Sequence, residues 1–290
     1  MRYLADLLHL IRWQNCVITM FVVVIAVLLA PFLPPVHKII IAAFAAGFIT
    51  AYGNIHNDIA DFEADKIDHP RRPLPSGKLS VRSAIILLQI MLVLGLVLSL
   101  LLNPQCFIIA AIASVALFLY SLFIKRIPLI SNIWVALIAA LTFIYTGYLN
   151  PFYMLWDFNL LNAGTLMAFF FHFGRELIKD LQDVEGDSRV GISTVAVSWS
   201  ENISRLLVTL AFIVVAILAV MIYIFLKPGL EFMVIFIIGV FLPVVILIFI
   251  MWKRPSHNTY KMISAWLKVL MPVGMLTLLL ARQKLPLDSF

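Results

Sequence analysis

Apolar residues fall in nine long blocks that short polar connections separate. Most blocks approach the roughly 20 residues that an α-helix needs to cross ~30 Å of hydrocarbon. No stretch alternates as the strands of a membrane barrel do, so only helices remain as spanning elements. We therefore predict an all-α integral membrane bundle of nine transmembrane helices. The predicted spans cover residues 15–33, 39–56, 83–102, 106–124, 132–149, 160–174, 206–226, 232–252 and 262–281.

Composition agrees with a membrane protein, because 63% of the residues are hydrophobic and only 12% are charged. The amphipathic stretch from Tyr3 to Trp13 precedes the first span, and the sixth span is short because charged residues begin at Arg175. Both cysteines, Cys16 and Cys106, lie in apolar blocks, which favours core packing over a disulfide. No low-complexity linker divides the chain, so we expect residues 1–290 to form one integral domain.

The net charge of +6 is distributed unevenly across the predicted spans. Sixteen Lys and Arg residues fall on the side of the N-terminus, and four fall on the other side. Cytoplasmic loops carry such an excess of cations. The pattern therefore predicts a multi-pass protein of the cell membrane with a cytoplasmic N-terminus and with Phe290 outside. It also explains the basic charge without a nucleic-acid partner.

Acidic residues gather in two short windows, 58–68 and 176–187, which hold ten of the fifteen in the chain. Each window contains the spacing D-x-x-D-x-x-x-D, and the second copy is shifted by 122 residues. Residues three, four and seven apart share a helix face, so each copy should align three carboxylates, with Asn57 and Glu176 extending the two stripes. The aligned residues are Asp58, Asp61 and Asp65 in the first window and Asp180, Asp183 and Asp187 in the second.

Carboxylates this close repel one another unless a cation lies between them. Oxygen ligands without a cysteine or histidine cluster suit Mg²⁺, which proteins hold with carboxylates and substrate phosphates. We expect the two stripes to face one another, with Mg²⁺ between them and a diphosphate bridging. Either window alone has a simpler interpretation as a solvated cytoplasmic loop, but matched spacing at the membrane edge favours function.

At these residues the chain resembles the UbiA superfamily of membrane prenyltransferases. The segment from Asn57 to Asp65 (NDIADFEAD) matches the family pattern N-D-x-x-D-x-x-x-D, and the segment from Asp183 to Asp187 matches its second pattern, D-x-x-x-D. Tyr120, followed by Lys125 and Arg126, resembles a Y-x-x-x-K element with one residue more in the spacing. The resemblance covers all nine blocks and the predicted cytoplasmic loops.

Two further segments bear on the substrate. Residues 69–77 (HPRRPLPSG) look like a stretch of digeranylgeranylglyceryl phosphate synthases that chlorophyll synthases largely share, and residues 174–187 are closer to the former. The resemblance thus implies geranylgeranyl transfer to geranylgeranylglyceryl phosphate in ether-lipid synthesis. The alternatives are an aromatic or tetrapyrrole prenyltransferase for quinones or chlorophyll-type pigments and, in another class, a secondary transporter. A transporter would place ionisable groups near the middle of its spans, where this chain has almost none.

The resemblance also implies roles for individual residues, a prenyl diphosphate donor and a lipid-like phosphorylated acceptor. Asp58 is expected either to bind the metal or to orient the first motif. The expected Mg²⁺ ligands are Asn57, Asp58, Asp61, Asp65, Asp180, Asp183 and Asp187. The expected catalytic residues are Asp61, Asp183, Asp187, Tyr120 and Lys125. The expected substrate-binding residues are Asn15, Arg71, Arg72, Lys125, Arg126, His172, Arg175 and Lys179.

Overall fold

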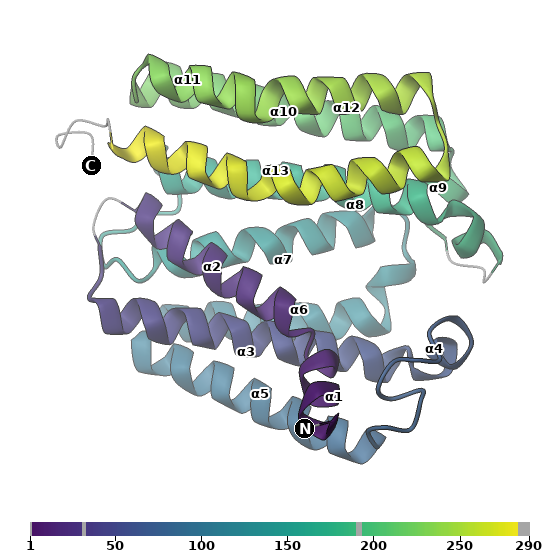
Figure 1. Ribbon diagram of the computed structural model, residues 1–290. Helices are drawn as coiled ribbons and strands as arrows, with labels where there is room; N and C mark the ends of the chain where they lie inside the picture. Colours follow the sequence, from purple (N-terminus) through teal and green to yellow (C-terminus); the bar gives the residue numbers. More distant parts are fainter. Residues whose placement is uncertain (1, 31–32, 190–192, 284–290) are drawn as a thin grey trace. The chain divides into compact units, whose positions relative to one another are not determined.

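The computed structural model describes residues 2–30, 33–189 and 193–283, and its regular elements there are all helical (Figure 1). Within the described residues, each predicted span overlaps one α-helix or, for 232–252, three consecutive helical elements. The elements are α1 (Arg2–Leu10), α2 (Trp13–Leu29), α3 (Val36–Ala60), α4 (Phe62–Asp68), α5 (Val81–Leu102), α6 (Pro104–Leu122), η1 (Ile124–Arg126), α7 (Ile130–Gly147), α8 (Leu160–Arg189), α9 (Val195–Ser198), α10 (Glu201–Leu226), α11 (Leu230–Phe236), η2 (Ile237–Phe241), α12 (Leu242–Lys253) and α13 (His257–Gln283).

Seven helices within the described ranges are long and apolar enough to cross a membrane, and the pair α1–α2, bent by 53°, makes an eighth candidate. The protein is therefore a multi-pass membrane protein. The predicted sixth span, 160–174, is the first half of α8, which continues to Arg189 and includes the second acidic window. Its Glu, Lys, Leu and Gln residues are good helix formers and explain this continuation. Nine spans stay a prediction, and residues 31–32 and Phe290 lie outside the described residues.

The chain divides into two compact units, and the first contains residues 2–27, 33–123 and 141–153. Here α3 packs against α5 and α6. Gly95 of α5 permits the close approach, because a Cβ at this position would lie 2.5 Å from Ile49 Cδ1. Small residues at such contacts let membrane helices pack tightly. The resulting core fixes α3, whose last turns carry the first acidic window.

The second unit contains residues 28–30, 124–140, 154–189 and 193–283. Its central helix is α8, which packs against α10 and α13. Gly174 allows the contact with α10, since a Cβ there would lie 2.9 Å from Phe212 Cε2. Farther along α8, the Gln182 carbonyl oxygen lies 2.8 Å from His257 Nδ1 at the start of α13. These contacts hold the charged half of α8, which carries the second acidic window.

Candidate active site

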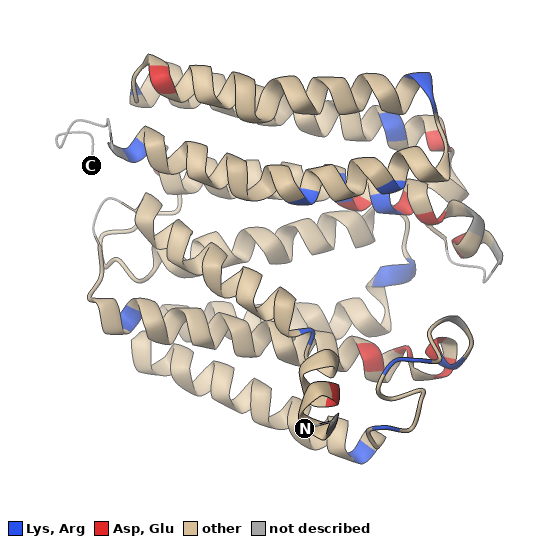
Figure 2. Ribbon diagram, viewed as in Figure 1, with Lys and Arg blue, Asp and Glu red and all other residues tan. Residues whose placement is uncertain are grey.

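The first acidic window lies at the junction of α3 and α4. Asp61 lies between the two helices, with φ −93° and ψ 4°. The backbone bonds from Asp61 N to Asn57 O and from Asp65 N to Asp61 O continue across it. The helical spacing that the sequence predicts is therefore kept through the junction. Figure 2 shows acidic residues in this region, whereas the body of α3 is almost free of charge.

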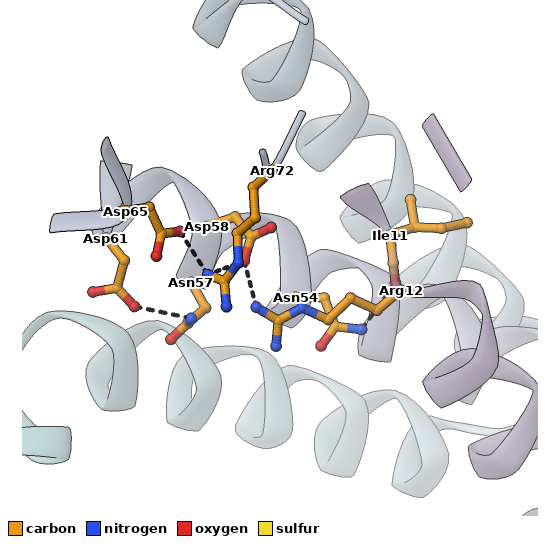
Figure 3. Close-up of polar contacts among 8 residues, drawn as sticks. All are labelled: Ile11, Arg12, Asn54, Asn57, Asp58, Asp61, Asp65 and Arg72. Carbon is orange, nitrogen blue, oxygen red and sulfur yellow. Dashed lines mark hydrogen bonds and ion pairs between the residues drawn. The ribbon is translucent and has the colours of Figure 1, made fainter. Parts of the chain in front are cut away.

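Two carboxylates of the first window are held by arginines (Figure 3). Asp58 and Asp65 are each only 4% exposed. Arg12 bonds to Asp58 Oδ1, and Arg72 Nη1 bonds to Asp65 Oδ2 and lies 3.7 Å from Asp58 Oδ1. Buried carboxylates need such partners, because an unpaired buried charge is costly. This geometry favours the orienting role for Asp58, and it makes Arg72 a partner of the motif.

A helix break positions Arg12 and a loop positions Arg72 beside the first acidic window. Arg12 occupies the break between α1 and α2 in the left-handed region, with φ 51°. The break is secured by Asn54 of α3, whose Nδ2 donates to the Ile11 carbonyl oxygen at 2.9 Å. Arg72 lies on the loop that follows α4, and Leu74 and Leu79 anchor this loop at 3% exposure each. Their cluster is completed by Leu10, Ile55 and Ala84.

Asn57 and Asp61 form a second pair on another side of the same helix. Asn57 Nδ2 donates to Asp61 Oδ2 at 3.0 Å, and both side chains are partly exposed. A carboxylate and an amide oxygen at a helix end are suitable ligands for a hard cation.

The second acidic window lies on one unbroken helix, α8. It begins with Glu176, which is 8% exposed. Arg175 Nη1 lies 2.8 Å from Glu176 Oε1, and Lys179 Nζ lies 2.6 Å from Glu176 Oε2. The two cations predicted to bind a substrate head group therefore already share a carboxylate. The N–H groups of Arg175 and Lys179 that do not contact Glu176 remain for binding an anion.

Asp180, one turn farther on, has a partner from α7. Asn132 Nδ2 donates to Asp180 Oδ2 at 2.8 Å. Burial raises the pKa of Asp180 to about 7, and the bond from Asn132 opposes this shift. Burial, assisted by the charge of Asp183, raises the pKa of Asp187 to about 6. Asp183 itself is exposed. The window thus holds carboxylates that a cation would stabilise in the charged form.

The remaining predicted residues occupy four places in the chain. Asn15 is exposed in the first turn of α2, and Arg71 is exposed beside Arg72. Tyr120 lies in the last turn of α6 and is partly buried. In η1, Lys125 is partly buried and Arg126 is exposed, whereas His172 of α8 is partly buried one turn before Glu176. The expected meeting of the two acidic windows stays a prediction.

The donor chemistry of both windows suits a divalent cation. Among the residues that the structure describes, no three His, Cys, Asp or Glu side chains already form a metal cluster. The oxygen donors of Asn57 and Asp61, and those of Asp180, Asp183 and Asp187, fit the ligand preference of Mg²⁺. The sequence prediction of a magnesium site therefore stands on donor type and on placement within each window.

Two residues that contact the windows were not singled out by the sequence analysis. Arg12 was counted only among the cytoplasmic cations, and Asn132 was taken as part of an apolar span. Their position in the sequence could have identified them. Each is a polar residue at or just before the start of an otherwise apolar helix, and polar residues at such positions usually have a function because their burial in a membrane is costly.

The described helices are those of a multi-pass membrane protein, and each acidic window offers oxygen donors that suit a divalent cation. Residues 17–271 match the UbiA prenyltransferase family. The chain belongs to this family and is a membrane prenyltransferase. The UbiA homologue of Archaeoglobus fulgidus bound to GPP and Mg²⁺ shares the fold, with a TM-score of 0.71 and 20% identity over 93% of this chain and 99% of that chain.

Relatives of known name are similar over most of their length. The digeranylgeranylglyceryl phosphate synthase of Methanocaldococcus jannaschii is 31% identical over 98% of this chain and 99% of its own. That of Sulfurisphaera tokodaii is 34% identical over 80% and 81%, respectively. A solved structure concerned with the biosynthesis of digeranylgeranylglyceryl phosphate synthase in membranes matches with a TM-score of 0.82 and 30% identity, covering 98% of this chain and 100% of that chain.

Proposed function

We propose that this prenyltransferase moves a geranylgeranyl group from its diphosphate to the free hydroxyl of geranylgeranylglyceryl phosphate, forming an ether lipid. The observation that carries the proposal is the similarity to digeranylgeranylglyceryl phosphate synthases across nearly the whole chain. The chain also offers more cationic side chains than one diphosphate requires, which agrees with an acceptor that brings a phosphate of its own. These cations are Arg71, Lys125, Arg126, Arg175 and Lys179.

In the reaction, the bond between C1 of the prenyl chain and the diphosphate oxygen breaks, and the electron pair leaves with the diphosphate. The hydroxyl oxygen of the acceptor forms the new bond to C1, and its proton passes to the departing diphosphate or to water. Mg²⁺, when bound, neutralises the charge that develops on the leaving group. The residues that would hold it are Asn57, Asp61, Asp180, Asp183 and Asp187, while Asp58 and Asp65 fix the two arginines.

Cationic side chains are the candidates for binding the diphosphate of the donor and the phosphate of the acceptor. Arg71, Lys125 and Arg126 are suited to diphosphate oxygens, Arg by bidentate contact and Lys as a point charge. Arg175 and Lys179 remain the candidates for the acceptor phosphate. Preorganised charges of this kind lower the barrier because they are in place before the leaving group departs.

We also propose that the whole chain acts as one catalytic domain with both acidic windows on the cytoplasmic side. The charge bias of the loops supports this orientation. Single cysteines at Glu63 and Gly186 test it, because Glu63 is exposed and a Cβ at Gly186 meets no atom within 4 Å. A membrane-impermeant maleimide should label both in inverted vesicles and neither in intact cells. The native cysteines, Cys16 and Cys106, are buried and serve as the background control.

Product analysis tests the reaction. Purified protein with geranylgeranyl diphosphate and Mg²⁺ should convert geranylgeranylglyceryl phosphate into the diether, which mass spectrometry detects as the addition of one geranylgeranyl group. Hydroxybenzoate, homogentisate and a chlorophyllide are the comparison acceptors. Prenylation of one of these without conversion of the glycerol phosphate would refute the proposed acceptor, whereas membership of the family would be unaffected.

A further inference from the structure

Asn132 presents an unusual combination of contacts beside the second acidic window. Its side chain is only 3% exposed in α7, and its Nδ2 donates to Asp180 Oδ2 at 2.8 Å. Its Oδ1 is enclosed and receives no hydrogen bond from any residue in the described ranges. Buried polar atoms of proteins almost always have a partner, so this acceptor requires a donor from outside the described protein, either a water molecule or a group of the substrate.

The orientation of the amide is determined by its neighbour. If Oδ1 and Nδ2 were exchanged, Oδ1 would face the Asp180 carboxylate oxygen, and two acceptors would oppose each other at hydrogen-bond distance. The observed orientation is therefore the one that the chemistry requires. Because both atoms belong to one planar amide, Oδ1 lies next to the Asp180 carboxylate and can only accept a hydrogen bond from a donor that enters the window.

Within the proposed reaction, we infer that Asn132 Oδ1 accepts the hydrogen bond of the acceptor lipid's free hydroxyl and so positions the nucleophile. This inference rests on the proposed function and adds a substrate-positioning residue to it. A hydroxyl that donates its single hydrogen to Oδ1 keeps its lone pairs available for attack on C1. Only three residues separate Arg126 from the first residue of α7, so a candidate phosphate-binding cation lies close to Asn132 along the chain.

The hydrogen bond from Asn132 to Asp180 holds the Asn132 side chain in one orientation. Asn132 donates with one end of the amide and accepts with the other, so the carboxylate fixes the direction of Oδ1. A side chain held in this way loses less freedom when a ligand binds. The substitutions differ in what they keep, because aspartate retains an acceptor oxygen, whereas leucine has nearly the same shape and offers neither a donor nor an acceptor.

A pair of ligands isolates the hydrogen bond. The first is geranylgeranylglyceryl phosphate, and the second is an analogue in which hydrogen replaces the free hydroxyl. Calorimetry on the detergent-solubilised protein measures both dissociation constants. The parent should bind the natural acceptor about fivefold more tightly, which corresponds to one ordinary hydrogen bond. Asn132→Leu should bind both ligands equally, whereas Asn132→Asp should keep a preference for the hydroxyl.

Thr146→Val is the matched control, because Thr146 is a buried polar residue of the same helix whose hydroxyl bonds only to carbonyl oxygens of its own helix. It should discriminate between the ligands as the parent does. Asn132→Leu that still prefers the hydroxyl acceptor would overturn the inference. If this variant does not fold, loss of the preference in Asn132→Asp would overturn the inference, and its retention would support it.

A second measurement separates this role from a role in metal binding. Without acceptor, the protein with geranylgeranyl diphosphate and Mg²⁺ should release diphosphate slowly to water, and Thr146→Val should do so at the parental rate. Because Asn132 also bonds to Asp180, the Mg²⁺ requirement of this release is measured for Asn132→Leu, and the two acceptor ligands are compared at a Mg²⁺ concentration that saturates each protein. If Asn132→Leu regains the preference for the hydroxyl ligand at saturating Mg²⁺, Asn132 serves Asp180 and the metal, and the inference is overturned. A parent protein that binds no glycerol phosphate lipid would instead refute the proposed function.

Discussion

In the first acidic window, Asp58 and Asp65 are buried against Arg12 and Arg72, and the helix is interrupted at Asp61. In the second window, the helix is unbroken, and the described partner of Asp180 is the neutral amide of Asn132. The same spacing of aspartates is thus supported by cations in one window and by burial beside an amide in the other.

This difference separates the tasks that a carboxylate can have. Where arginines neutralise the carboxylates, the aspartates contribute to structure and fix the loop that carries Arg72. Where an uncharged group is the partner, negative charge remains to attract an external cation. The comparison suggests that the first window is mainly preformed by the fold, whereas the charged state of the second depends on what binds to it.

The largest effect on turnover should come from removing a carboxylate that is proposed to bind Mg²⁺. Asp61→Ala and Asp183→Ala should each reduce turnover by more than about a hundredfold, since one lost ligand costs several kcal/mol of transition-state stabilisation. EDTA should stop the parent enzyme, and Mg²⁺ should restore it. A radiolabelled prenyl transfer assay measures these rates.

Glu63→Ala is the control for this experiment. Glu63 lies in the first window, but its side chain is 80% exposed and pairs with Lys66. Its removal should leave the rate within about twofold, because surface ion pairs contribute little. An Asp183→Ala enzyme as fast as the parent would show that one window suffices for catalysis.

The next effect concerns stability and tests the arginine clamp. Arg72→Ala leaves two buried carboxylates short of a partner and should destabilise the protein by about 2–4 kcal/mol, below the full cost of a buried pair because Arg72 is 28% exposed. Arg71→Ala, at an exposed position next to it, should leave the thermal midpoint almost unchanged. Thermal unfolding in detergent measures both. Equal midpoints for the two variants would show that the clamp does not stabilise the fold.

A smaller effect is expected at the start of the second window. Arg175→Ala should weaken the binding of geranylgeranylglyceryl phosphate several-fold and that of the prenyl diphosphate less, because Arg175 is a candidate for the acceptor phosphate. Glu176→Gln should have the opposite effect on the acceptor, since it releases Arg175 and Lys179 from their shared carboxylate. Equilibrium binding of each substrate measures the change. Equal weakening of both substrates by Arg175→Ala would refute this assignment.

Much of this organisation could be predicted from the sequence. Apolar blocks of membrane length locate the helices, because hydrocarbon leaves the backbone few alternatives. The repeated aspartate spacing locates both windows. The distinction between them could not be predicted, because it depends on contacts between distant residues. Arg12 lies 46 positions from Asp58, and Asn132 lies 48 positions from Asp180.

The end of α8 lies beyond the end of the predicted span. The span 160–174 was predicted to stop where charge begins, and residues 176–187 were predicted to share a helix face; α8 includes both segments in one helix from Leu160 to Arg189. Hydrophobicity marks the membrane boundary, whereas helix propensity and packing against α10 and α13 decide where the helix ends. The charged extension of α8 is the consequence, and it is the element that carries Asp180, Asp183 and Asp187.

The smallest effect is a pH dependence to which the second window should contribute most, although burial also raises the pKa of Asp58 in the first window against the opposing charges of Arg12 and Arg72. The native pKa values of Asp180 and Asp187, about 7 and about 6, lie above the ordinary value of 3.8. The folded state therefore binds protons that the unfolded state has already released between about pH 4 and pH 7. Stability from these groups is present at low pH and is lost as the pH rises through the native pKa values. In EDTA, the thermal midpoint should fall by a few degrees between about pH 5 and pH 8.

Asp180→Asn removes the largest of these titrations and should flatten the pH dependence, whereas the exposed change Glu63→Gln should leave it as in the parent. Excess Mg²⁺ should also flatten it, because a bound cation stabilises the charged carboxylates and lowers their native pKa values. If Asp180→Asn and the parent lose stability in parallel as the pH rises, the titrating groups lie elsewhere. The second window would then be as fully preformed as the first, and the contrast between an arginine-supported and a cation-dependent window would fail.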